Sequence, residues 1–261
     1  MKRWYGLLAL LALVVGTASL AAHLPARVVA GWLRPNLAPQ VALAGVSGTV
    51  WHPRAQQITV ALPQGPELKL GPAELDLGLW RLITGAVGVH ARLEAYGGQL
   101  QARGWLGWGG RWQVQHLQGG LPLGNLAKVD PRLAMAQLDG RALIRSDGLR
   151  GQADQLQGGG IRLGLTDLAV GWLAEDRPLG DFSLPLAIPE PDKLTGELSS
   201  ASGNALRAQG ELALDRAKGR IRFTGEAWAG ANANATIREA LPLLGRMQGE
   251  RALIRYQGRL R

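Results

Sequence analysis

Short segments of this chain alternate apolar and polar residues with a period of two, and no other feature constrains the fold as strongly. In a β-strand this alternation puts the apolar side chains on one face of a sheet and the polar ones on the other. One apolar and one solvated face are typical of antiparallel sheets. The alternating segments are residues 73–79, 87–93, 100–103, 112–115, 161–165, 206–209 and 220–224.

Glycine favours the same fold class. The chain has 37 glycines among 261 residues, and each glycine inside a helix costs about 1 kcal/mol relative to alanine, which disfavours long helices. Turns between strands are expected at the glycine clusters 97–98, 109–110, 119–120 and 158–160. Short helices are expected at 26–33, 79–84 and 239–247, and a weaker helical pattern at 123–133 is interrupted by Pro131.

Residues 4–22 form an apolar run without a charged side chain, directly after Lys2 and Arg3. A helix of this length nearly spans the hydrocarbon core of a bilayer, and the preceding positive charges keep its first end in the cytoplasm. We therefore predict a cytoplasmic N-terminus at residues 1–3, a transmembrane signal-anchor helix at 4–23 and a periplasmic β-rich domain at 24–261. The anchor residues of this helix are expected to be Trp4, Leu7, Leu11 and Val15.

A cleaved signal peptide is the alternative, because the small residues from Ala18 to Ala22 offer a cleavage site. The apolar run is longer than a usual signal-peptide core, which favours the uncleaved anchor. Both interpretations export the rest of the chain. The expected location is the cell inner membrane, with a single pass and the C-terminal domain in the periplasm. The predicted fold is mainly β: one N-terminal transmembrane helix followed by a large, curved, mostly antiparallel β-sheet domain with a few short helices.

An internal repeat indicates how the β-domain is built. The pentapeptide from Arg141 to Arg145 recurs unchanged from Arg251 to Arg255, and an apolar stretch and a glycine precede each copy. Residues 41–51 resemble the pattern more weakly. Repeats without a catalytic residue point to architecture, here a repeated β-unit. The alternative is independent use of a turn followed by a strand.

Few residues point to chemistry. The chain has no cysteine, which removes disulfides, zinc-thiolate sites and thiol catalysis. No HExxH pair, nucleophile elbow or phosphate-binding loop is present. We therefore expect no catalytic residue, no cofactor and no metal, and a protein that is not an enzyme. No two of the four histidines stand four residues apart, as a metal-binding pair on a helix would; they are His23, His52, His90 and His116.

The net charge of +9 comes mostly from arginine. The basic residues are scattered along the sequence and form no dense run, so nucleic acid is not an expected partner. A basic surface that faces anionic lipid or an acidic partner fits this distribution better.

The segment from Leu43 to His52 resembles the beginning of the periplasmic part of type II secretion system protein N, also called general secretion pathway protein N. The resemblance includes the size, the single anchor, a glycine-rich β-domain and the motif Ser47, Gly48, Thr49, Val50 and Trp51. Pro53 follows the motif and His52, where a small residue such as glycine is more usual.

The resemblance implies a non-catalytic, inner-membrane-anchored accessory component of the type II secretion apparatus. Such a component acts in protein export by protein–protein contacts in the periplasm, with the secretin or inner-membrane platform proteins as partners. Residues 47–51 are expected to form a turn into a strand, with a positive φ at Gly48, and to be first structural and second an interaction surface.

A lipid-handling protein of the AsmA and TamB kind, with an apolar β-groove, is the alternative function, and lipid is then a ligand. The inner face of the sheet separates the two hypotheses. A packed core beneath these strands favours the scaffold, and an open groove favours lipid handling. The strand residues that decide it are Leu75, Leu77, Leu79, Ile161, Leu163 and Leu165.

Overall fold

The computed structural model describes residues 25–28, 41–61, 67–128, 134–153, 155–174 and 178–259. The predicted N-terminus and anchor helix, with Trp4, Leu7, Leu11 and Val15, lie outside these residues. Within the described ranges, no helix combines the length and the apolar character that crossing a membrane requires.

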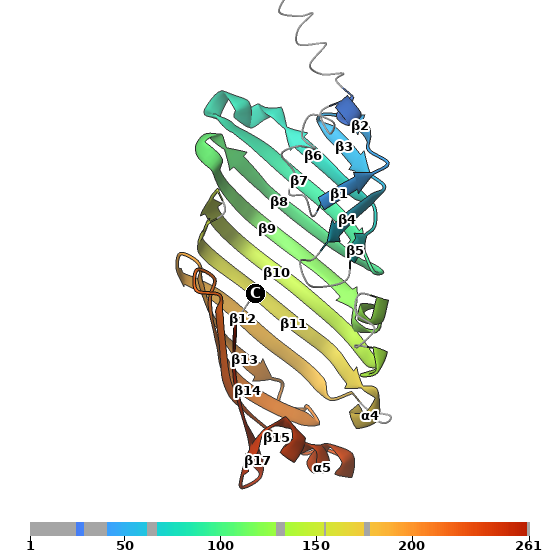
Figure 1. Ribbon diagram of the computed structural model, residues 1–261, viewed down its shortest axis with the longest axis vertical. Helices are drawn as coiled ribbons and strands as arrows, with labels where there is room; N and C mark the ends of the chain where they lie inside the picture. Colours follow the sequence, from blue (N-terminus) through green and yellow to red (C-terminus); the bar gives the residue numbers. More distant parts are fainter. Residues whose placement is uncertain are drawn as a thin grey trace, which may run out of the picture.

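Fourteen antiparallel strands form one large sheet in which most strands lie beside their neighbours in sequence (Figure 1). This confirms the predicted mainly β fold with a large antiparallel sheet. The order across the sheet is β16-β17-β15-β14-β13-β12-β11-β10-β9-β8-β7-β6-β3-β2. The strands are β2 (Ser47–Thr49), β3 (His52–Ala55), β6 (Ala73–Gly78), β7 (Ala86–Ala95), β8 (Gly98–Gly107), β9 (Arg111–Pro122), β10 (Leu138–Gln152), β11 (Gln155–Val170), β12 (Gly180–Glu190), β13 (Lys193–Ser200), β14 (Leu206–Asp215), β15 (Arg220–Ala229), β16 (Arg246–Gln248) and β17 (Arg251–Arg259).

Cross-strand pairing carries the period-two pattern along the whole sheet. Leu75 lies opposite Ala91 near one end, and Leu212 lies opposite Phe223 near the other. The paired registers in between place these apolar residues on one side of the sheet, which we call the apolar face. The opposite side, the polar face, carries side chains such as those of Arg222 and Gln257, which are also cross-strand partners.

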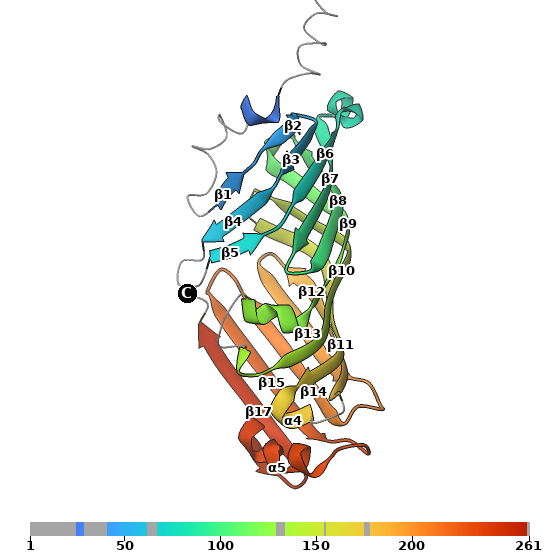
Figure 2. The same ribbon diagram turned by 90° about the vertical axis from the view of Figure 1, so that its right-hand side faces the viewer.

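Three further strands form a small sheet in the order β1-β4-β5: β1 (Val41–Ala44), β4 (Gln57–Ala61) and β5 (Glu67–Leu70). Along the chain, β1 leads into β2, β3 into β4 and β5 into β6. At this end, the small sheet and strands β2, β3 and β6 of the large sheet thus form one three-stranded meander that bends. The large sheet is curved, and the small sheet lies over its concave side (Figure 2).

Backbone contacts fix the bend. Gly45 has a φ of +65°, a conformation that favours glycine. The Gln56 N–H donates to the carbonyl of Ala44 at 3.0 Å, and the Gly71 N–H donates to the carbonyl of Glu94 at 2.7 Å. A Cβ at Gly71 would lie 2.8 Å from that same carbonyl oxygen of Glu94, so the strand comes this close to β7 because residue 71 is glycine.

The helices are short. Residues 26–28 are helical, and the remainder of the expected helix at 26–33 lies outside the described residues. The helix expected at 79–84 is present, and only the first part of the 123–133 pattern is described as helical. The elements are η2 (Leu79–Thr84), η3 (Trp108–Gly110), η4 (Leu123–Lys128), α4 (Gly171–Ala174) and α5 (Ala235–Leu244).

The helix expected at 239–247 is displaced toward the N-terminus, because α5 begins at Ala235 and ends at Leu244. Its start is set by Asn234, whose side-chain oxygen accepts a hydrogen bond from the N–H of Ile237 at 2.8 Å. Met247 lies in β16 instead.

Two of the four glycine clusters are not turns, which corrects the sequence prediction. Gly119–Gly120 lies inside β9, and Gly158–Gly160 lies inside β11. A Cβ at Gly119 would lie 2.7 Å from the Leu100 side chain, and one at Gly159 would lie 2.0 Å from the carbonyl oxygen of Gly148. These glycines allow neighbouring strands to approach closely, which is the other established use of glycine in a sheet.

The buried core is concentrated at the C-terminal end of the sheet. Helix α5 places Ile237 and Ala240 in a buried cluster with Phe182 and Leu179. A second cluster joins Leu241 to Ala227 and Ala252. The described chain has 13 buried hydrophobic residues, which is a small core for a sheet this large. Backbone pairing therefore supports much of the sheet.

Gly159→Ala should destabilise the protein by about 3 kcal/mol, because Gly159 has a φ of +119° and its Cβ would meet the backbone of the paired strand. Gly148→Ala on β10, the strand paired with β11, is the matched control, since a Cβ at Gly148 meets nothing within 4 Å. Urea unfolding of both full-length variants measures the difference. An equal loss of stability in the two variants would contradict the close-approach explanation.

Candidate functional site

The predicted motif forms a tight hairpin at the bent end of the large sheet. Its first three residues, 47–49, are strand β2, and Val50 and Trp51 form the turn into β3. The motif was expected to begin as a turn and continue as a strand. Instead it begins as a strand, and its turn lies at its end. Gly48 has a φ of +83°, and a Cβ there would lie 2.3 Å from the carbonyl oxygen of His52. The glycine is therefore needed by the backbone.

Hydrogen bonds connect this hairpin to the rest of the sheet. The N–H of Leu77 donates to the carbonyl of Trp51 at 2.7 Å, which ties the turn to β6. The N–H of His52 donates to the Thr49 hydroxyl at 3.3 Å and closes the turn. Pro25 forms an isolated antiparallel bridge to Thr49 on the outer side of β2. The motif is thus an integral part of the sheet.

An open cavity of about 430 Å³ lies between the small sheet and strands β3, β6 and β7. We call it the inter-sheet cavity. Three charged residues contribute to its lining, namely Arg54, Glu74 and Arg92. By alternation these three belong to the polar face, so the interior offers aliphatic surface. Its aliphatic lining residues are Leu43, Val46, Val50, Ile58, Leu75, Leu77 and Leu93.

The inter-sheet cavity can hold an apolar group but supplies no side chain for acid–base or nucleophilic chemistry to it. Two of the charged residues beside it form an ion pair: Arg54 Nε lies 3.2 Å from Glu74 Oε1, with the side chains 66% and 44% exposed. An exposed pair of this kind contributes about 0–1 kcal/mol to stability. The site therefore favours binding over catalysis.

The apolar face is partly open along the middle of the sheet. Leu100, Leu117, Ile144 and Leu163 are only half-buried there. Leu75 and Leu77 line the inter-sheet cavity, whereas Leu165 packs against the C-terminal core. The side chain of Leu79 lies outside the described set. Among the residues that the structure describes, the core clusters beneath the apolar face thus lie at its C-terminal end.

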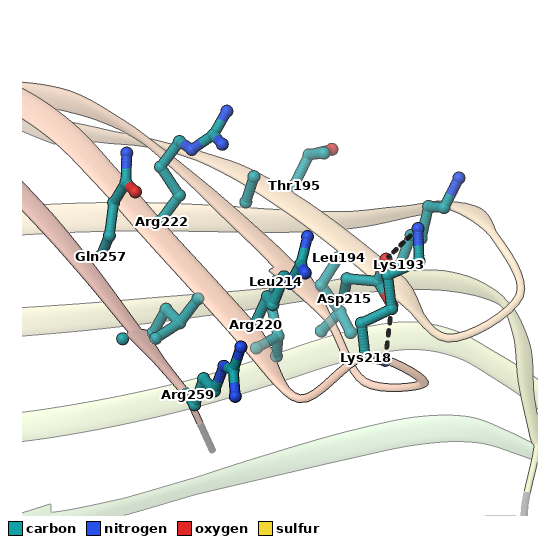
Figure 3. A pocket seen from close by; sticks show the side chains of 13 residues that line it. Lys193, Leu194, Thr195, Leu214, Asp215, Lys218, Arg220, Arg222, Gln257 and Arg259 are labelled. Carbon is teal, nitrogen blue, oxygen red and sulfur yellow. Dashed lines mark hydrogen bonds and ion pairs between the residues drawn. The ribbon is translucent and has the colours of Figure 1, made fainter.

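A second hollow, of about 590 Å³, lies across β13, β14, β15 and β17 (Figure 3). We call it the basic cleft, because five of its lining residues are Lys or Arg and one is acidic. Lys218 Nζ lies 3.7 Å from Asp215 Oδ2, which compensates that carboxylate. Figure 3 shows Asp215 beside Lys218, and in the pairing of β14 with β15 Asp215 also lies opposite Arg220. The charged residues are Lys193, Asp215, Lys218, Arg220, Arg222 and Arg259.

Sequence reasoning missed this cleft because its charges come from four separate strands. Arg220 lies directly opposite Arg259, although the two are far apart in the chain. A usable signal was present: Lys218, Arg220 and Arg222 alternate with a period of two, which puts arginines on one face of a strand. The alternation does not show that β17 pairs with β15, or which residues of the two strands lie opposite each other.

Lys193, at the rim of the basic cleft, interacts with the carboxylate of Glu190 on the neighbouring strand. The ammonium of Lys193 donates to Glu190 Oε2 at 2.5 Å, and this hydrogen bond and the Glu190 charge raise the pKa of Lys193.

As for metals, the part of the chain that the structure describes brings no three His, Asp or Glu side chains together in a way that could hold an ion. Asp76 Oδ1 lies 3.9 Å from His52 Nε2, and Asp76 Oδ2 lies 4.0 Å from His90 Nδ1.

Comparison with protein families matches residues 39–254 to the family described as type II secretion system (T2SS), protein N. The matched range includes the motif, the lining of the inter-sheet cavity except Ala26, and most of the basic cleft. No curated protein matches the chain, and no solved structure does.

Glu190→Gln should lower the pKa of Lys193 toward its ordinary value, because the variant removes the carboxylate that favours the ammonium. A raised lysine pKa adds stability below the ordinary pKa and loses it as the pH rises through the raised value. Lys193 is exposed, so the expected change in stability is small. Side-chain NMR titration measures the pKa, with Glu197→Gln on β13, the strand of Lys193, as the control. An unchanged Lys193 pKa in Glu190→Gln would contradict the assignment.

Proposed function

The chain belongs to the type II secretion system protein N family, and from this we propose that it is a non-catalytic accessory component of the type II secretion apparatus. It acts by protein–protein contacts in the periplasm. The family match over residues 39–254 carries the proposal. The basic cleft and the outer side of β17, which β16 pairs only at Arg251–Leu253, support it, because both are surfaces suited to binding another chain.

We also propose that residues 4–23 anchor the protein in the inner membrane, through Trp4, Leu7, Leu11 and Val15. The charge-free run after Lys2 and Arg3 supports a single pass with residues 24–261 in the periplasm.

This topology has a consequence for the motif. A single residue separates the proposed anchor from Pro25, and Pro25 is bridged to Thr49. Because consecutive Cα atoms lie about 3.8 Å apart, the motif hairpin then sits close to the membrane surface. This position suits contacts of Ser47–Trp51 with inner-membrane platform proteins better than contacts with an outer-membrane secretin.

Deletion of the gene should reduce export of the folded substrates and leave them in the periplasm.

A photo-crosslinker at the exposed Ser47 should trap a platform component, and one at the exposed Glu197, far from the motif, should not. A reporter fused after the last residue should be active in the periplasm. Normal export together with no crosslink to a secretion component would refute the accessory role, and a reporter active only in the cytosol would refute the topology.

A second candidate function is lipid handling, and two observations favour it. The inter-sheet cavity is lined by aliphatic side chains, and its volume falls within the usual range of ligand pockets, about 300–1,000 Å³. The apolar face beyond it is only half-buried along the middle strands. An acyl chain is the ligand class that such a surface accepts.

Under this second function, Ala91→Phe should reduce the lipid that co-purifies with the full-length protein, because residue 91 lines the inter-sheet cavity and the larger side chain fills it. Ala187→Phe is the matched control, since Ala187 is exposed on the polar face. Mass spectrometry of extracted lipid gives the amount bound. Wild-type protein that carries no lipid, or equal lipid in all three proteins, would refute lipid handling in this cavity.

A further inference from the structure

The last strand of the large sheet leaves most of its outer side unpaired. Strand β17 pairs with β15 from Arg251 to Arg259, but on its other side β16 covers only Arg251–Leu253. Among the residues that the structure describes, Ile254–Arg259 has no strand neighbour on that side. We call this segment the open edge. Unpaired backbone N–H and C=O groups in such a row form a template for another strand.

The opposite edge of the same sheet is protected. Strand β2 is only three residues long, and Pro25 bridges its Thr49 from outside. Short edge strands and covering segments are the usual ways in which proteins prevent strand addition. The difference between the two ends makes the open edge the part of the large sheet that is available for pairing.

Side chains on the open edge alternate between the two faces. Tyr256 lies opposite Phe223 on the apolar face and is 56% exposed. Ala252, on the same face where α5 covers β17, is fully buried. The apolar face therefore ends in an exposed aromatic side chain beside unpaired backbone. Arg255 and Arg259 lie on the polar face.

On β17, the arginine beside β16 forms an ion pair with a carboxylate. Beside β16, Arg251 Nη1 lies 2.6 Å from Glu226 Oε1, and its guanidinium lies 4.7 Å from the centre of the Trp228 ring. Beside the open edge, Arg220 lies between Asp215 on β14 and Arg259 on β17, and the two arginines repel each other.

The basic cleft continues this excess of positive charge. Its one carboxylate is Asp215, which is already paired with Lys218. Within the described part of the chain, no ion pair joins a carboxylate to Arg220, Arg255 or Arg259. A negatively charged group brought to the open edge would relieve this repulsion.

We propose that the open edge binds an extended acidic segment of another protein, which adds to β17 as a further strand. Its acidic side chains alternate with apolar ones: the acidic residues face Arg255 and Arg259, and the apolar residues pack beside Tyr256. Backbone hydrogen bonds supply affinity and the alternation supplies specificity, as in other cases of strand addition. The inference deepens the proposed accessory role, on which it rests, by naming the chemistry of one contact.

A second copy of this chain fits the open edge less well. In a symmetric antiparallel pair of β17 strands, the arginines of one copy would face those of the other, and the repulsion already present would increase. Charge complementarity therefore selects an acidic partner over self-association.

Fluorescence anisotropy of labelled peptides with the full-length protein in neutral detergent tests the proposal. The first probe is a heptapeptide that alternates Glu and Val. The second replaces each Glu by Lys, and the third keeps Glu but carries N-methyl groups that block strand pairing. The acidic peptide should bind at least about tenfold more tightly than either of the other two. The double variant Arg255→Glu/Arg259→Glu should reverse the preference toward the lysine peptide.

The reversal is a gain of binding, so it also shows that the variant is folded. Arg103→Glu/Arg145→Glu is the matched control, since both arginines are exposed on other strands and the variant should keep the preference for the acidic peptide. Equal binding of the N-methylated acidic peptide would overturn strand addition. No binding of any peptide would mean that the arginines only prevent pairing, which also overturns the proposal.

Vesicles containing phosphatidylglycerol distinguish a lipid surface from a peptide. Binding of these vesicles through Arg255 and Arg259, without binding of the acidic peptide, would overturn the proposal in favour of anionic lipid. The peptide assay does not depend on export. Normal export with intact peptide binding would refute the accessory role alone, and lost export on gene deletion without peptide binding would refute this contact alone.

Discussion

The antiparallel hydrogen-bond ladder through fourteen strands is the interaction on which the rest of the molecule depends. The described part of the chain buries few hydrophobic residues, and most of these gather around α5. Elsewhere the sheet is supported by backbone pairing and by contacts between cross-strand neighbours. This explains why glycines such as Gly159 lie inside strands: where β10 and β11 touch through their backbones, a Cβ would break the ladder.

The strands of the large sheet could be predicted because a period of two fixes which side chains share a face, whatever the partner strand is. The bend could not, because Gly45 and Gly71 look in sequence like turn glycines, and only the three-dimensional path shows strands that continue beyond them. The same ambiguity made the interior glycines of β9 and β11 look like turns. The basic cleft was missed because it depends on register: Arg220 and Arg259 meet only when β15 and β17 are paired.

The two faces of one sheet provide two kinds of surface, and these dominate at opposite ends. At the N-terminal end the bent meander covers the apolar face incompletely and leaves the inter-sheet cavity. At the C-terminal end α5 packs on part of the apolar face, and the exposed features are Tyr256, positive charge and the unpaired part of β17. A partner at one end and a ligand at the other would therefore contact different side chains, joined through the strands between them.

The order of strands in the large sheet almost reproduces the order of the chain, with hairpins linking one strand to the next. Such local connectivity gives a low contact order, which favours rapid folding. A newly made chain that emerges from its N-terminus can pair each strand as soon as the following one appears, so no half-finished sheet must wait for a distant segment.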